Sequence, residues 1–280
     1  MGSHLPPATL SVLEQQPTLP APAQQLRVLL AEDQPINQRV VVRILEKRGH
    51  SLMDVGNGRE ALEALVSQSF DVVLMDVQMP DMDGIEATRV IRLQERGTAR
   101  HQPIVVLTAY AIKGDRERFL AEGFDGYLSK PIASSALYET IERLVSSPAP
   151  LSIAWPDKPA LAAFAPGPLN AAWDQAAALA RVDNDTPFLK ELIRIFLNIS
   201  SNFLAELEAA VTRRDAAAIA RVAHTLKGNV AMLCATPTLE QTLLVENKAI
   251  KADLDGIEAD FAELKRRLID LQAALETFAC

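Results

Sequence analysis

Short apolar runs alternate with amphipathic stretches in the first half of the chain, and this alternation limits the possible folds most. Val28–Ala31, Val72–Met75 and Ile104–Leu107 have the length and composition of buried strands, whereas Asn37–Lys47 and Gly84–Glu95 have helical spacing. Strands that alternate with helices favour βαβ units and a parallel sheet with both faces covered. The pattern therefore predicts an α/β module with a doubly wound parallel sheet.

A different pattern follows the proline-rich stretch Ser146–Pro168. From Asn170 to Cys280 the chain has Ala-, Leu- and Glu-rich segments with helical spacing and no strand pattern. This half predicts an antiparallel helical bundle, so the expected fold class is α/β plus all-α. The regions that we expect are 1–25, a tag remnant and a proline-rich linker; 26–146, the α/β module; 147–169, a Pro/Ala-rich linker; and 170–280, the bundle.

The composition is that of a soluble globular protein. Hydrophobic residues make up 49% and charged residues 23% of the 280 positions, and no uncharged apolar stretch approaches the roughly 20 residues of a membrane span. The net charge of −8, without a cluster of Lys and Arg, argues against nucleic-acid binding. Two cysteines without zinc-ligand spacing fit a reducing cytoplasm. We expect a cytoplasmic fragment without membrane contact of its own, compatible with a parent protein anchored in the inner membrane.

Polar residues follow the predicted strands of the α/β module. Glu32 and Asp33 follow the first strand, Asp76 and Thr108 end two later ones, and Lys130 follows a short apolar pair. Ligands bind beyond the carboxyl ends of parallel strands, so these side chains can converge, and crowded carboxylates suit a hard cation such as Mg²⁺. Asp76 can then attack phosphorus, while Lys130 and Thr108 hold phosphoryl oxygens. Taken singly, an aspartate at the end of a strand is more often a cap or turn residue, and a lysine before a proline is more often part of a solvated turn.

A histidine in the second half has an unusual position on its predicted helix. The apolar residues of that helix form one stripe: Ile219, Val222, Leu226, Val230 and Leu233. His224 lies roughly 140° round from Ile219, with Lys227, Gly228 and Ala231 on its side. We expect an exposed histidine whose small neighbours allow a partner to approach closely. A solvated histidine beside an incidental glycine fits the spacing equally well. We expect the other histidines of the untagged chain, His50 and His101, to be solvated surface residues.

Four segments of the first module resemble the response-regulator receiver family, in the variant found inside hybrid sensor kinases. They are Leu30–Gln38, Met75–Gly84, Leu107–Ala109 and Gly126–Pro131, and the similarity covers residues 26 to 146. The resemblance implies a flavodoxin-like sheet of five strands and a cis peptide before Pro131. It also implies the roles of the site residues: Asp76 as phosphoacceptor; Glu32, Asp33, Asp76 and the Gln78 carbonyl as Mg²⁺ ligands; Thr108 and Tyr127 as a switch pair; and Lys130 as phosphate-binding lysine.

The second module resembles the histidine-containing phosphotransfer family, whose domains are four-helix bundles. The similarity covers residues 170 to 280 and rests on Ala223–Gly228, followed by Leu239, Leu243 and Glu246. It implies that His224 accepts a phosphoryl group from a receiver aspartate and passes it on, with Lys227 and Gly228 at the docking surface. One position departs from the family: Cys234 stands where a glycine is usual.

Together the two resemblances predict the C-terminal part of a hybrid sensor histidine kinase that works in a two-component phosphorelay. An upstream kinase core would phosphorylate Asp76, His224 would take the phosphoryl group, and a downstream response regulator would receive it. We find no ATP-binding kinase core, so the expected activity is phosphotransfer alone. One alternative is a binding module controlled by phosphorylation, with a passive bundle. Another is an aspartyl phosphatase, which is disfavoured because Gln78 stands where those enzymes have a second aspartate.

Overall fold

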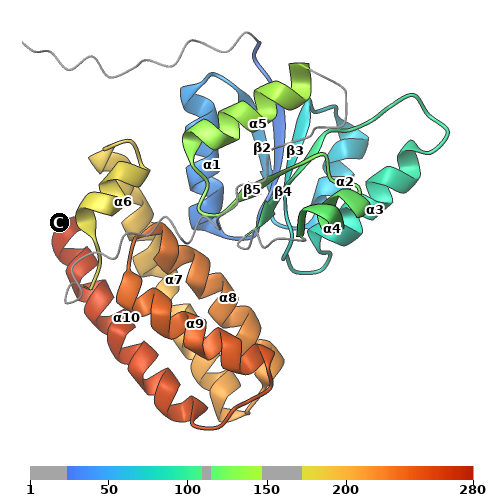
Figure 1. Ribbon diagram of the computed structural model, residues 1–280. Helices are drawn as coiled ribbons and strands as arrows, with labels where there is room; N and C mark the ends of the chain where they lie inside the picture. The colour runs from blue at the N-terminus through green and yellow to red at the C-terminus, as the bar shows by residue number, and fades with distance from the viewer. Residues whose placement is uncertain (1–23, 109–114, 147–171, 280) are drawn as a thin grey trace, which may run out of the picture.

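The computed structural model describes residues 24–108, 115–146 and 172–279, which form an α/β module and a helical bundle (Figure 1). The expected tag remnant and most of both expected linkers lie outside the described residues. Five parallel strands make one sheet in the order β2-β1-β3-β4-β5, as expected for a doubly wound receiver fold. The elements of this module are β1 Arg27–Ala31, α1 Pro35–Lys47, β2 Ser51–Val55, α2 Gly58–Ser67, β3 Val72–Asp76, α3 Gly84–Glu95, β4 Ile104–Thr108, α4 Asp115–Ala121, β5 Gly126–Ser129 and α5 Ser134–Ser146.

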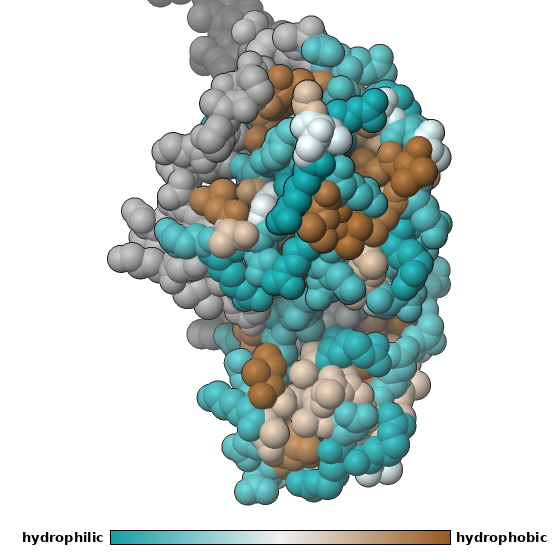
Figure 2. Space-filling model, turned by 90° about the vertical axis from the view of Figure 1, so that its right-hand side faces the viewer, coloured by the Kyte–Doolittle hydropathy of each residue, from teal (hydrophilic) through white to brown (hydrophobic). Residues whose placement is uncertain are grey.

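Alternation along the central strands gives the sheet two apolar faces. Val28 and Leu30 point to the face covered by α1 and α5, whereas Leu29 and Ala31 point to the face covered by α2, α3 and α4. Because both faces are covered, β3 and β4 are buried along their whole length. Hydrophilic and apolar side chains are interspersed on the outer surface that Figure 2 shows.

Four long helices and one short helix form the bundle. They are α6 Gln175–Arg181, α7 Thr186–Thr212, α8 Ala216–Met232, α9 Thr236–Ile250 and α10 Ile257–Ala279. Asp174, Asp185 and Asp215 cap the first three of these helices, each accepting a hydrogen bond from a backbone N–H of the first turn. Cys234 ends the turn before α9 with φ at 56°, a left-handed conformation that glycine adopts more readily. Cys234 is buried there.

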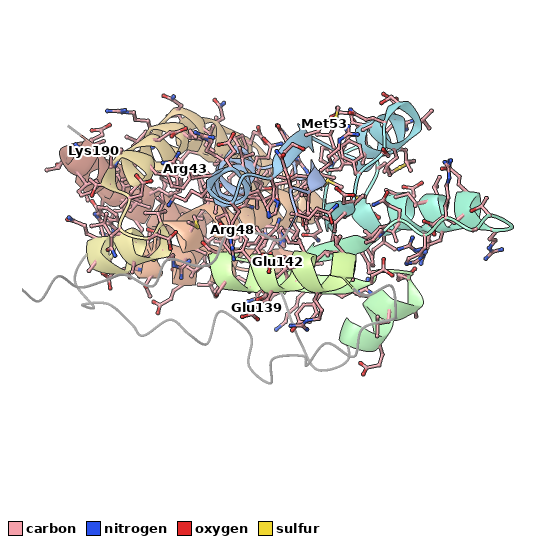
Figure 3. The ribbon with its side chains drawn as sticks, turned by 90° about the horizontal axis from the view of Figure 1, so that it is seen from above. Arg43, Arg48, Met53, Glu139, Glu142 and Lys190 are labelled. Atoms are coloured by element: carbon pink, nitrogen blue, oxygen red, sulfur yellow. The ribbon has the colours of Figure 1, made fainter. Side chains whose placement is uncertain are left out.

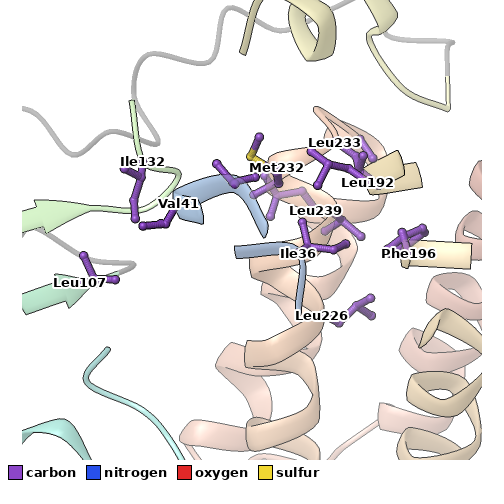
Figure 4. Close-up of a cluster of buried hydrophobic side chains, with 14 of the residues drawn as sticks. Ile36, Val41, Leu107, Ile132, Leu192, Phe196, Leu226, Met232, Leu233 and Leu239 are labelled. Atoms are coloured by element: carbon purple, nitrogen blue, oxygen red, sulfur yellow. The ribbon is translucent and has the colours of Figure 1, made fainter. Parts of the chain in front are cut away.

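The two modules pack against each other through α1. This helix contacts α7 and α8, and its buried Ile36 belongs to an apolar cluster that continues into the bundle through Leu226 and Met232 (Figure 4). No helix within the described ranges has both the length and the apolar character needed to cross a membrane.

The structure corrects the expectation for His50. The side chain is buried, and Nδ1 accepts a hydrogen bond from the backbone N–H of Leu26 at 3.2 Å. Burial lowers the pKa of His50 below its ordinary value. His101 is largely exposed, as expected, although Nε2 lies 2.6 Å from Oδ1 of Asp125.

Candidate functional site

Three carboxylates meet at the carboxyl ends of β1 and β3. These strands pair in parallel with Ala31 opposite Met75, so Glu32 and Asp33 follow β1 beside Asp76 at the end of β3. One carboxylate oxygen from each of the three residues lies within 4.8 Å of the other two. Glu32 and Asp76 are buried, so water does little to screen their repulsion.

Lys130 brings a positive charge to this cluster. It follows β5, and its peptide bond to Pro131 is cis, as expected. Its Nζ lies 2.6 Å from Oε2 of Glu32 and 2.7 Å from Oδ2 of Asp76. Burial alone would lower the pKa of Lys130, but the two carboxylates raise it above its ordinary value, so the ammonium stays charged.

One lysine does not balance three carboxylates. Burial, with a smaller effect from the charge of Asp76, raises the pKa of Glu32 to about 8 and that of Asp33 to about 6. Oδ1 of Asp33 is buried and has no hydrogen-bond partner among the described residues. An unpartnered carboxylate oxygen beside two others is a donor set that fits a hard divalent cation. The acidic cluster can therefore hold a metal ion.

The other expected receiver residues surround this cluster or lie behind it. Thr108, the last residue of β4, is buried next to β3, whereas Tyr127 is buried in the apolar core under α4. Gln78 is exposed two residues after Asp76. Asn37, to which the sequence analysis gave no role, donates a hydrogen bond from Nδ2 to Oε1 of Glu32 at 3.1 Å.

The partly buried His224 of α8 pairs with the buried Glu246 of α9. Nδ1 of His224 lies 2.7 Å from Oε1 of Glu246, whose side chain is 1% exposed. Burial would raise the pKa of Glu246, but hydrogen bonds from His224 and Lys227 outweigh it and lower that pKa. An ionised carboxylate only accepts hydrogen bonds, so in the neutral imidazole the tautomer with its proton on Nδ1 is the one that can donate to Glu246. The lone pair then remains on Nε2, the nitrogen that can attack an electrophile.

Lys227 differs from its expected place. Its side chain is 3% exposed, because Nζ reaches α9 and donates to both carboxylate oxygens of Glu246, at 2.7 and 2.8 Å. His224 is 24% exposed, so the histidine side of the helix is less open than the helical projection indicates. Nζ also lies 3.2 Å from Nδ1 of His224, so Lys227 contacts both members of the pair from a buried position.

The two halves of the site meet in one small cavity between the modules. This cavity has a volume of about 40 Å³, which is room for a few water-sized groups. Its lining residues are Gln34, Asn37, Asp76, Lys130 and Pro131 from the α/β module, and His224, Lys227, Gly228 and Ala231 from the bundle. Asp76 and His224 thus face the same space.

Comparisons with known proteins identify the two modules. A family model for the response regulator receiver domain matches residues 28–142, and a model for the Hpt domain matches residues 191–274. The polar-differentiation response regulator DivK of Brucella anthropi is 36% identical over 115 residues, which are 41% of this chain and 92% of DivK. The sensory/regulatory protein RpfC of Xanthomonas campestris is 26% identical over 208 residues, 74% of this chain and 28% of RpfC.

A solved structure is also similar. It is the receiver domain of sensor histidine kinase PA1611 from Pseudomonas aeruginosa, solved with a magnesium ion in its active-site cleft. The two sequences are 40% identical. The match covers 44% of this chain and all of that domain, with a TM-score of 0.41. Four further relatives, among them hybrid signal transduction histidine kinase I of Dictyostelium discoideum, are much longer, and the chain covers only 7% to 14% of each.

The acidic end of the sheet and the histidine of the bundle define a protein of two-component phosphorelay signalling. This chain belongs to the response regulator receiver family, and an Hpt domain follows its receiver domain.

Proposed function

We propose that Asp76 takes a phosphoryl group from the phosphohistidine of an upstream kinase and passes it to His224 of the same chain. His224 then donates it to a separate response regulator. The observation that carries this proposal is the cavity that both residues line. In this proposal residues 26–146 are the receiver domain, residues 170–280 the phosphotransfer domain, and region 147–169 the linker between them. Region 1–25 is a tag remnant followed by a proline-rich linker.

The transfer step needs no change in the protonation of the bundle. The lone pair of His224 Nε2 attacks phosphorus, and the bond between phosphorus and the Asp76 carboxylate oxygen breaks. Its electron pair returns to Asp76, while the proton on Nδ1 stays in place. The imidazole ring gains positive charge in this step, and the Glu246 carboxylate, 2.7 Å from Nδ1, stabilises that charge.

On the receiver side, Lys130 is the group that holds a phosphoryl oxygen, because its Nζ already lies 2.7 Å from the Asp76 carboxylate. The Thr108 hydroxyl is the second donor, and Thr108 and Tyr127 are the switch pair that responds to it. We assign Glu32, Asp33, Asp76 and the Gln78 backbone carbonyl as ligands of Mg²⁺. When bound, Mg²⁺ would neutralise negative charge on the phosphoryl group.

Labelling with acetyl phosphate tests this assignment. Asp76→Asn keeps the shape of the side chain but removes the nucleophilic carboxylate, so Mg²⁺-dependent labelling of the receiver should disappear. Asp54→Asn is the matched control, because Asp54 is an exposed carboxylate on the edge strand β2. Undiminished labelling of Asp76→Asn would show that Asp76 is not the acceptor.

A further inference from the structure

A basic stripe runs along α1 beside the cavity. Arg39, Arg43 and Lys47 follow one another at intervals of four residues, so they lie on one side of the helix. That side faces the bundle, as Arg43 does in Figure 3. The stripe takes no part in the chemistry of Asp76.

An acidic surface at the beginning of α7 receives this stripe. Nη2 of Arg43 lies 2.9 Å from Oδ2 of Asp185, and Nζ of Lys47 lies 3.4 Å from Oδ2 of Asp183. Arg39 contacts both carboxylate oxygens of Glu191, one turn and a half further along α7. The three basic residues thus meet three acidic residues in opposite chain order, because α1 and the beginning of α7 run antiparallel along the contact.

An aromatic ring lies beneath the two arginines. The guanidinium carbons of Arg39 and Arg43 lie 5.9 and 5.6 Å from the centre of the Phe188 ring, within the range of a cation–π interaction. Phe188 is itself buried, so its ring is fixed. The acidic surface is therefore Asp183, Asp185 and Glu191 around Phe188.

We infer that this acidic surface is the recognition element by which the bundle selects receivers, and that it accepts those with a basic stripe on their first helix. The inference rests on the proposed function, in which His224 exchanges phosphoryl groups with receiver aspartates. The chain's own receiver is one such partner. A regulator that takes the phosphoryl group from His224 must carry cations at the corresponding positions of its first helix.

The electrostatics of the contact suit an exchangeable partner. Single exposed ion pairs stabilise a contact only weakly, so this row sets the register and the encounter rate, and reversing one charge is enough to change how often a receiver docks. While the chain's own receiver is docked, it covers the cavity that His224 lines. A receiver from solution therefore competes with it for the same surface.

A mixture of two complete chains distinguishes the receiver that docks from solution from the acceptor chain's own receiver, which competes with it. The donor chain carries His224→Gln and is phosphorylated at Asp76 by acetyl phosphate; the acceptor chain carries Asp76→Asn, so its His224 can be labelled only by another chain. Arg39→Glu is then placed in either chain, and label on the acceptor is followed over time. Lys265→Glu is the matched control, because Lys265 pairs with Glu208 at 3.2 Å within the bundle.

The inference predicts effects of opposite sign. Arg39→Glu in the donor should slow intermolecular transfer about threefold to tenfold, because the incoming receiver then presents a negative charge to Glu191 of the acceptor. The same substitution in the acceptor should speed transfer, because the competing receiver leaves the surface. Glu191→Arg in the acceptor should restore the rate with the Arg39→Glu donor, and Lys265→Glu should change no rate.

Equal effects from both chains, or no effect from either, would overturn the inference. If no mixture labels His224 at all, the proposed function fails. In that case the radius of gyration of the otherwise unaltered chain still tests the contact: Arg39→Glu should expand the molecule, and the further substitution Glu191→Arg should compact it again. An unchanged radius in Arg39→Glu would then reject the recognition element as well.

Discussion

Gln34 of the receiver lies directly over Gly228 of the bundle. A Cβ added to Gly228 would lie 3.0 Å from Oε1 of Gln34, closer than almost all Cβ atoms approach an oxygen. Gly228 makes the helix about 1 kcal/mol less stable than alanine would, but its lack of a side chain lets the two modules approach each other.

Gly228→Leu should slow transfer between Asp76 and His224 at least about tenfold, because a 1 Å displacement of reacting groups has effects of that order or larger. Helix content should stay constant or rise slightly. Adding Gln34→Ala should recover part of the rate, which a defect in the bundle itself would not allow. Transfer at the normal rate in Gly228→Leu would contradict the close-approach explanation.

Glu246→Gln should reduce transfer roughly tenfold to a hundredfold, because the amide can still accept the hydrogen bond from Nδ1 but no longer offsets positive charge on the ring. Glu246→Asp, which keeps a carboxylate, should retain more of the rate than Glu246→Gln. Rapid-quench time courses measure both variants. Equal losses in the two variants would indicate a structural role only.

Asp33→Ala should weaken Mg²⁺ binding roughly tenfold, because the site loses one of its few anionic ligands. The Mg²⁺ concentration that gives half-maximal labelling by acetyl phosphate measures this change. Asp54→Ala, which removes an exposed carboxylate from β2, is the control for net charge. The same midpoint in Asp33→Ala and in the unaltered chain would exclude Asp33 from the metal site.

His50 should make the stability of the receiver depend on pH. The pKa of His50 is lowered in the fold, so below the ordinary value of 6.5 the unfolded chain binds a proton that the folded chain does not bind. The contribution of His50 to the free energy of unfolding of the receiver should therefore be constant above that pH. It should fall as the pH decreases towards 5. Protonation of Nδ1 would also break its hydrogen bond with Leu26.

Urea denaturation at pH 7.5 and pH 5 measures this effect, with His50→Asn as the comparison. Asparagine offers an acceptor near the position of Nδ1 but does not titrate, so the variant should lose less stability on acidification. Equal losses in both proteins would show that His50 does not contribute to the acid sensitivity.

Much of the fold can be predicted from local patterns. The buried strands β1, β3 and β4 are continuous apolar runs, and α3 begins and ends where its amphipathic pattern does. The edge strand β2 lacks such a run, because most of its residues are exposed or partly exposed. His50 was placed wrongly because the adjacent Gly49 indicates a turn, whereas the imidazole turns inward to accept the N–H of Leu26.

The site is only partly predictable for a similar reason. A helical projection gives the direction of a Cβ, but the long side chain of Lys227 bends back to Glu246 on the next helix. The contact between the modules joins Arg39 to Glu191, residues 152 positions apart, so no local pattern indicates it. The spacing of Arg39, Arg43 and Lys47 at intervals of four residues does indicate a basic stripe, but it does not indicate what that stripe contacts.

The transfer of a phosphoryl group from Asp76 to His224 within one chain tests the central claim most directly. The chain is labelled with radioactive acetyl phosphate, and base-stable, acid-labile phosphate is followed over time in the unaltered protein and in His224→Gln. Our account predicts that this phosphate accumulates after the aspartyl phosphate in the unaltered protein and is absent from a folded His224→Gln variant. Base-stable, acid-labile phosphate in that variant would contradict it.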